Sequence, residues 1–237
     1  MKTKSTSELK LESFEQLNKK YLSLHKKYTG VYEQLISDVE AKAHHRQYAK
    51  GGWTIHRGFY SPSFQDLVTG GCNRGRLLKK EPKSRKYSFE YIFDEHDRLI
   101  CVKRRDDNVN VSSVEMIVYE ETRVLSLVYD VLLNHAPHCI LECWYENNNI
   151  RRYERATLEL GGSRCFDIIV EESSYEEQIL SSVLMSVYIP EIHTLKRERY
   201  DFYRDEKGQL NTYTVRSIGV NSDTDVIFED PKVYKVF

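Results

Sequence analysis

Residues Tyr87 to Lys103 contain the pattern that most constrains the fold of this chain. The first part, YSFEYIF, places an aromatic residue at every second position, which is the period of a β-strand. The turn-forming residues DEHDR follow, and LICVK then resumes an apolar strand. The stretch therefore predicts a β-hairpin.

The hairpin pattern recurs further along the chain. Phe202 to Leu210, FYRDEKGQL, aligns with Tyr91 to Leu99, YIFDEHDRL, and Gly208 takes the position of Asp97. The bulky residues that end the first strand of each repeat are separated by 26, 25, 26, 34 and 24 residues, and they are Phe93, Tyr119, Trp144, Val170, Arg204 and Phe228. This spacing predicts about six hairpins, or up to about twelve antiparallel strands, over residues 87–237. So many strands are expected to curl, close or fold into two layers.

Residues 1–50 are predicted to be a helical segment. Apolar residues recur at alternating steps of 3 and 4 in Phe14, Leu17, Tyr21, Leu24, Tyr28, Val31 and Leu35. Thr29-Gly30 is expected to split the segment into two helices, because glycine disfavours a helix interior. We expect the apolar stripe to pack on the sheet; the alternative is a dimer seam. Lys19 and Lys20 are expected on the solvated side.

The predicted fold class is α+β, with an N-terminal amphipathic helix or helical pair packed on a large antiparallel β-meander of repeated ~25-residue hairpins. A glycine-rich, basic connector over residues 51–86 separates the two parts, and a short helix is expected at Ser63 to Val68. Tyr175 to Tyr188 fits a helix and a strand about equally well.

Composition and charge narrow the class of protein. No apolar stretch is long enough to span a bilayer, and the N-terminal residues lack the apolar core of a secretory signal. The five cysteines are scattered, which favours reduced thiols and a cytoplasmic location. The net charge of −1 hides an asymmetry: residues 1–105 carry 22 basic and 12 acidic side chains, and residues 106–237 carry 13 and 24.

Pairs of acidic residues follow most of the aligned bulky positions, as in Glu120-Glu121, Glu171-Glu172 and Asp205-Glu206. If these pairs lie at equivalent turns, they should form an acidic rim along one edge of the sheet. Such a rim would suit a basic protein surface. Acidic residues also solubilise tight turns, which is the simpler explanation of the same pattern.

The pattern F/Y-x-Y/F-x-x-D-E-x-G-x-L at Tyr200 to Leu210 and Phe89 to Leu99 resembles the tyrosine-aspartate hairpin repeats of bacterial Rhs-type proteins. It is also similar to small β-hairpin proteins that serve as immunity partners of bacterial polymorphic toxins. The resemblance covers roughly residues 87–237. It implies an intracellular binding protein and supplies no catalytic residues.

The function that the sequence favours is non-enzymatic protein binding. The resemblance implies that the protein is the immunity partner or inhibitor of a bacterial toxin. The predicted binding residues are the acidic pairs and two adjacent aromatic residues: Glu120, Glu121, Trp144, Tyr145, Glu171, Glu172, Asp205 and Glu206. No catalytic residue, metal, cofactor or membrane is predicted. The oligomeric state is left open.

Two other functions are weighed against protein binding. The first is a nucleic-acid-binding module that uses the basic connector, through Arg74, Arg76, Lys79, Lys80, Arg85 and Lys86. The second is an enzyme with a phosphate-binding or cysteine-based site in the loop Gly70 to Gly75, where Cys72 would need His56 as its base. His135, His138, Cys139 and Cys143 have a spacing close to that of metal ligands, but the two cysteines also alternate as core residues of a strand do.

Overall fold

The computed structural model describes residues 6–51, 76–131, 135–159, 164–218 and 232–235. Two N-terminal helices, α1 (Thr6–Tyr28) and α2 (Tyr32–Lys42), precede an antiparallel sheet of 13 described strands. The strands are β1 (His45–Lys50), β2 (Arg76–Leu78), β3 (Ser88–Phe93), β4 (Leu99–Arg105), β5 (Ser113–Tyr119), β6 (Arg123–Asp130), β7 (Pro137–Glu146), β8 (Asn149–Leu158), β9 (Cys165–Glu176), β10 (Ile179–Ile189), β11 (Thr194–Arg204), β12 (Leu210–Ile218) and β13 (Lys232–Lys235). A 3-10 turn, η2 (Pro190–Ile192), connects β10 to β11.

The helical segment divides where glycine was expected to divide it. Gly30 has a φ of +78°, a left-handed conformation that most other residues adopt at a cost. The backbone N–H of Thr29 still donates to the carbonyl of His25, and the second helix begins at Tyr32. The helical part of residues 1–50 was expected to extend from about Ser7 to Tyr48, but α2 ends at Lys42 and His45–Lys50 forms strand β1.

The sheet is a meander in which nearly every strand pairs with its neighbours in the chain. The order is β13-β12-β11-β10-β9-β8-β7-β6-β5-β4-β3-β1-β2. β1 inserts next to β3, with Gln47 opposite Tyr91, and β2 pairs with the outer side of β1. The segment around Tyr175 to Tyr188 is part of the β9–β10 hairpin, so its strand pattern prevails over its helical one.

The first and last aligned hairpins share the same turn. In the β3–β4 turn, Asp94 Oδ1 accepts hydrogen bonds from the backbone N–H groups of His96 (3.0 Å) and Arg98 (2.9 Å). In the β11–β12 turn, Asp205 Oδ1 accepts them from Lys207 and Gln209, both at 2.9 Å. Asp97 and Gly208 hold the equivalent left-handed position, with φ of 62° and 76°. The alignment of these two segments in the sequence therefore matches their geometry.

Replacing Gly208 with alanine is expected to lower the free energy of unfolding by about 1 kcal/mol. In the left-handed conformation the added Cβ lies too close to the backbone carbonyl oxygen that follows it. A Cβ at this position would have no atom within 4 Å, so crowding adds nothing. Gly208→Asp is the matched control and should cost less, because Asp97 adopts this conformation in the equivalent turn. Urea unfolding curves measure both. Equal stability of Gly208→Ala and the unchanged chain would contradict the prediction.

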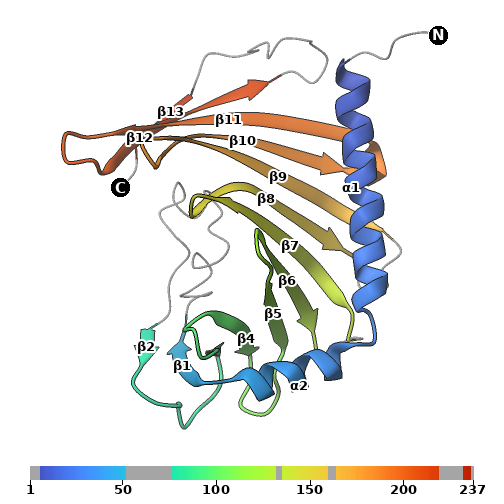
Figure 1. Cartoon of the computed structure of the whole chain (residues 1–237), viewed down its shortest axis with the longest axis vertical. Helices are drawn as coiled ribbons and strands as arrows, with labels where there is room; N and C mark the ends of the chain where they lie inside the picture. Colours follow the sequence, from blue (N-terminus) through green and yellow to red (C-terminus); the bar gives the residue numbers. More distant parts are fainter. Residues whose placement is uncertain (1–5, 52–75, 132–134, 160–163, 219–231, 236–237) are drawn as a thin grey trace.

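The sheet is curved, and the two helices lie together along its outer side (Figure 1). Its two ends, β2 and β13, are not paired with each other, so the described strands curl without closing into a barrel. The predicted helical stripe packs on the sheet: Phe14 and Tyr21 are buried in one core with strand residues such as Leu127 and Ile168.

The opposite face of the sheet has two further apolar clusters. Phe89, Tyr91 and Phe93 lie on this face, as the alternation in the first hairpin predicts, and they pack with residues of β1 and β4–β8. A smaller cluster around Val183, Met185 and Phe202 covers the same face of β9–β11. Both faces of the curved sheet are therefore apolar along much of their length.

Candidate functional site

Five described turns lie at the same end of the strands, because each joins an odd-numbered strand from β3 to β11 to the strand that follows it. The turns after β5, β7, β9 and β11 follow one another from the centre to the upper left of Figure 1. We call their carboxylates the acidic rim: Asp94, Glu95, Asp97, Glu120, Glu121, Glu146, Glu176, Glu177, Asp205 and Glu206.

Three carboxylates of the acidic rim are neutralised by an arginine that follows in the same hairpin. Asp94 pairs with Arg98, with Oδ2 2.8 Å from the guanidinium. Glu120 pairs with Arg123 at 2.7 Å, and Glu146 with Arg151 at 2.7 Å. The hydrogen bond from Arg123 holds the pKa of Glu120 below its usual value. These pairs fix the turns in place and reduce the charge that the rim offers to a partner.

Other carboxylates of the acidic rim face water. Glu121, Glu177 and Glu206 are exposed, and within the described part of the chain none of them lies in an ion pair. Each sits on a different hairpin, so the negative charges are spaced along the edge of the sheet. This spacing is set by the strand pairing, since neighbouring strands lie about 4.8 Å apart.

The prediction that Glu171-Glu172 lies at a turn was wrong. Both residues are inside strand β9, where successive side chains point to opposite faces. Glu171 is only 4% exposed and pairs in register with Tyr153 and Met185, so it cannot contact a partner. Glu172 is exposed, and its carboxylate lies 3.0 Å from Arg152. The turn of this hairpin lies further on, at Glu177-Gln178, where both residues have positive φ.

The two predicted aromatic residues also point to opposite faces. Trp144 is on the helix side of β7, where the ammonium of Lys20 lies 4.9 Å from its ring centre. Tyr145 packs against the apolar cluster on the other face, and burial raises the pKa of its hydroxyl. Three of the eight predicted binding residues, Glu120, Trp144 and Glu172, belong to the group of contacts around Lys20 that is described next. Tyr145 and Glu171 lie on the other face of the sheet.

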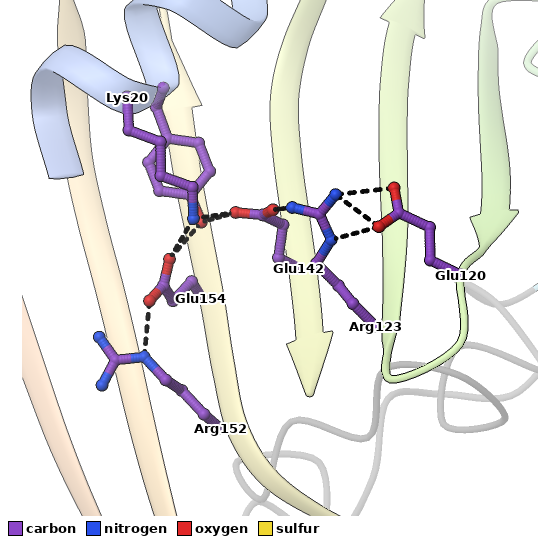
Figure 2. A network of polar contacts seen from close by, with 7 residues as sticks. Lys20, Glu120, Arg123, Glu142, Arg152 and Glu154 are labelled. Atoms are coloured by element: carbon purple, nitrogen blue, oxygen red, sulfur yellow. Dashed lines mark hydrogen bonds and ion pairs between the residues drawn. The ribbon is translucent and has the colours of Figure 1, made fainter. Parts of the chain in front are cut away.

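Lys20 belongs to a buried polar network between α1 and the middle of the sheet (Figure 2). Its ammonium contacts Glu142 and lies 2.9 Å from Glu154 Oε2. The Tyr21 hydroxyl lies 3.0 Å from Glu142 Oε2 and 2.7 Å from Glu154 Oε2. Glu142 and Glu154 face each other across β7 and β8, and their residues are 0% and 2% exposed.

Two arginines continue this network toward the surface. Arg123 bridges Glu142 and Glu120, and Arg152 bridges Glu154 (2.6 Å) and Glu172 (3.0 Å). The network therefore connects the first helix to one turn of the acidic rim and to strand β9. The prediction that Lys20 lies on the solvated side was wrong, since its side chain is one-third exposed and holds two buried carboxylates.

Burial, nearby charges and hydrogen bonds shift the pKa values of Glu154 and Tyr21 in this network. Burial opposes ionisation of Glu154, but the Lys20 charge and the hydrogen bonds from Lys20, Tyr21 and Arg152 outweigh it and lower its pKa. Burial and the two nearby carboxylates raise the pKa of Tyr21 well above its ordinary value. Tyr21 is thus held as a hydrogen-bond donor. Since each carboxylate has cationic and hydroxyl partners, the network is suited to fixing α1 on the sheet.

The sequence contained one signal for this network, and our interpretation missed it. Glu142 lies between Ile140 and Trp144 in the alternation of β7, at a position where an apolar residue is expected. A charged residue at a strand position whose side chain points into the core indicates a buried partner of opposite charge or a hydrogen-bond donor. The partner comes from a helix more than one hundred residues earlier, since Tyr21 precedes Glu142 by 121 positions.

The residues with metal-like spacing do not converge. Cys139 and Cys143 lie on one face of β7 with Leu141, as the alternation predicts, and His135 lies 3.6 Å from Glu33 of α2 instead. Among the described residues no group of three or more His, Cys, Asp or Glu side chains is placed to hold a metal ion. Burial raises the pKa values of the Cys101 and Cys143 thiols, and that of Cys165 to about 12, so these thiols are poor nucleophiles.

The basic connector is described in part. Arg76 lies in β2 and is exposed, as are Lys79, Lys80 and Lys86. Arg85 pairs with Glu81. Arg74, Cys72, His56, the loop Gly70 to Gly75 and the expected helix at Ser63 to Val68 lie outside the described residues.

Neither described helix has the length and apolar content that crossing a bilayer requires. Comparison of the chain with models of known protein families and with curated proteins finds no match.

Proposed function

We propose that this protein is a binding scaffold that uses the acidic rim to hold a basic surface of another protein. The observation that carries the proposal is the row of exposed, unpaired carboxylates, represented by Glu121, Glu177 and Glu206 on three different hairpins. A row of like charges on a stiff support attracts a complementary surface and speeds its association. The resemblance to immunity partners makes a basic toxin domain the class of protein that we expect there.

The support for the acidic rim is rigid. Asp205 accepts two backbone hydrogen bonds within its turn, and Asp94 does the same in the first hairpin. The Glu120 turn is joined through Arg123 to the buried network under α1. Because the turns are held in place before binding, a partner would lose little conformational entropy in ordering them.

Charge reversal tests this function directly. The triple variant Glu121→Lys, Glu177→Lys, Glu206→Lys is expected to lose a protein partner that the unchanged chain retains in affinity capture from its native lysate. It should keep its fold, because all three side chains are exposed and outside the described ion pairs. Circular dichroism and a thermal unfolding curve check the fold of each variant.

The control reverses three exposed acids elsewhere, Glu33→Lys, Asp38→Lys and Glu191→Lys, which lie on α2 and η2, where Glu33 and Glu191 contact His135 and Arg164. This variant has the same net charge and should retain the partner. Equal capture by both variants would contradict the proposal. Capture that is abolished by nuclease treatment would favour nucleic acid and the basic connector instead.

A further inference from the structure

A cavity of about 640 Å³ opens on the described part of β9–β12, and Glu176 is the one carboxylate of the acidic rim among its lining residues. Its lining includes Arg199, Asp201, Arg216, Glu176 and Ser181. Arg199 and Asp201 alternate along β11 on the same face as Leu195, which belongs to the core that α1 covers. α1 packs mainly on β7, β8 and β9, and the cavity lies beside it, on the neighbouring strands β11 and β12.

Two arginines face each other across the strands in this cavity. Arg199 and Arg216 are direct partners in the β11–β12 ladder, an arrangement in which like charges repel. Asp201 lies between them: its Oδ1 is 2.9 Å from Arg199 Nε, and its Oδ2 is 3.7 Å from Arg216 Nε. The second distance is too long for a hydrogen bond. The Asp201 carboxylate thus lies near both guanidinium groups but accepts a hydrogen bond only from Arg199.

Two buried polar atoms at this place have no hydrogen-bond partner. They are Arg216 Nε and Thr214 Oγ1, and both are enclosed within the described part of the chain. Thr214 is 7% exposed and pairs in register with Asp201, which places its hydroxyl on the same face as the arginines. Buried donors are nearly always satisfied in folded proteins, so these two groups leave hydrogen-bonding capacity for a water, an ion or a ligand.

From these observations we infer that the cavity binds the phosphate group of a small phosphorylated molecule. Arginine is suited to phosphate because its planar fork presents several N–H donors to the phosphate oxygens. Arg216 and Arg199, which both line the cavity, supply the donors. Glu176 and Ser181 line another part of the cavity, so the molecule also carries an amino or hydroxyl group that can donate to them. A volume of about 640 Å³ accommodates such a ligand.

Isothermal titration calorimetry of the full chain tests this site with two probes, inorganic phosphate and phosphoethanolamine. Both are expected to bind, and phosphoethanolamine more tightly, because its ammonium group meets Glu176. Arg216→Gln should weaken both probes by about tenfold or more, which corresponds to the loss of a charged hydrogen bond. Glu176→Gln should weaken phosphoethanolamine and leave inorganic phosphate unchanged.

Arg151→Gln is the matched control, since it makes the same change of charge at the β7–β8 turn, where Arg151 pairs with Glu146. If Arg216→Gln does not fold, Arg199→Lys replaces it, because it keeps the charge and removes the fork. Failure of both probes to bind the unchanged chain would overturn the inference. So would equal affinity for either probe in Arg151→Gln and in the cavity variant, or a Glu176→Gln chain that binds phosphoethanolamine as before.

Discussion

Replacing Lys20 with methionine is expected to lower the free energy of unfolding by about 3 kcal/mol. The substitution keeps the bulk of the side chain but removes the cation that Glu142 and Glu154 share. Removing one partner of a buried ion pair is costly because the other charge stays buried. The loss should fall at the lower end of the range for such changes, since Arg123 and Arg152 still contact the two carboxylates.

Urea unfolding measures this loss, and Lys19→Met is the matched control. Lys19 is exposed and adjacent in sequence, so its replacement should change the unfolding free energy little. The double variant Lys20→Met, Glu154→Gln should recover part of the loss, because it also removes one uncompensated carboxylate. A Lys20→Met chain as stable as Lys19→Met would show that the network does not hold α1 on the sheet.

Tyr21 gives the second large effect, and two substitutions separate its packing from its hydroxyl. Tyr21→Ala should cost about 3–5 kcal/mol, because the ring is fully buried and its removal leaves a cavity. Tyr21→Phe keeps the ring and removes only the donor that Glu142 and Glu154 accept. It should cost about 1–3 kcal/mol, because it removes hydrogen bonds to two buried charged groups, which keep only Lys20, Arg123 and Arg152 as partners.

Chemical denaturation of both Tyr21 variants checks these values, with Tyr203→Phe as a control on an exposed tyrosine. The expected order of unfolding free energies is unchanged chain and Tyr203→Phe, then Tyr21→Phe, then Tyr21→Ala. If Tyr21→Phe were as stable as Tyr203→Phe, the hydroxyl would contribute nothing and the contact of α1 would depend on apolar packing alone.

Local sequence patterns were sufficient to predict that the described strands from β3 to β12 form hairpins, and that a helix covers them. The alternation at Phe89, Tyr91 and Phe93 gives the correct face of β3, and the shared turn of Asp94 and Asp205 follows from the alignment of the two hairpins. The apolar stripe on α1 predicts its docked side. These features depend on residues close together in the chain, so their periodicity is visible in the sequence.

Features that depend on distant pairing were missed. β1 carries the polar sequence HRQYAK, and it becomes a strand because β3 supplies an antiparallel partner with Gln47 opposite Tyr91. Glu171 is buried because β9 is longer than the repeat spacing suggested, which moves the turn to Glu177-Gln178. The cross-strand pair of Arg199 and Arg216 depends on the register of β11 and β12, which composition does not reveal.

α1 is far in sequence from the strands on which it packs, and this separation affects the order in which the chain can fold during synthesis. Tyr21 precedes Glu142 by 121 residues and Glu154 by 133 residues. At a synthesis rate of about 5–20 residues per second, roughly 7–27 seconds pass between the appearance of Tyr21 and that of both carboxylates. Strands β3 to β6 can pair in order during that interval, because each needs only the strand before it. The element made first is therefore packed late, because the surface that its apolar stripe covers is complete only when β9 has emerged.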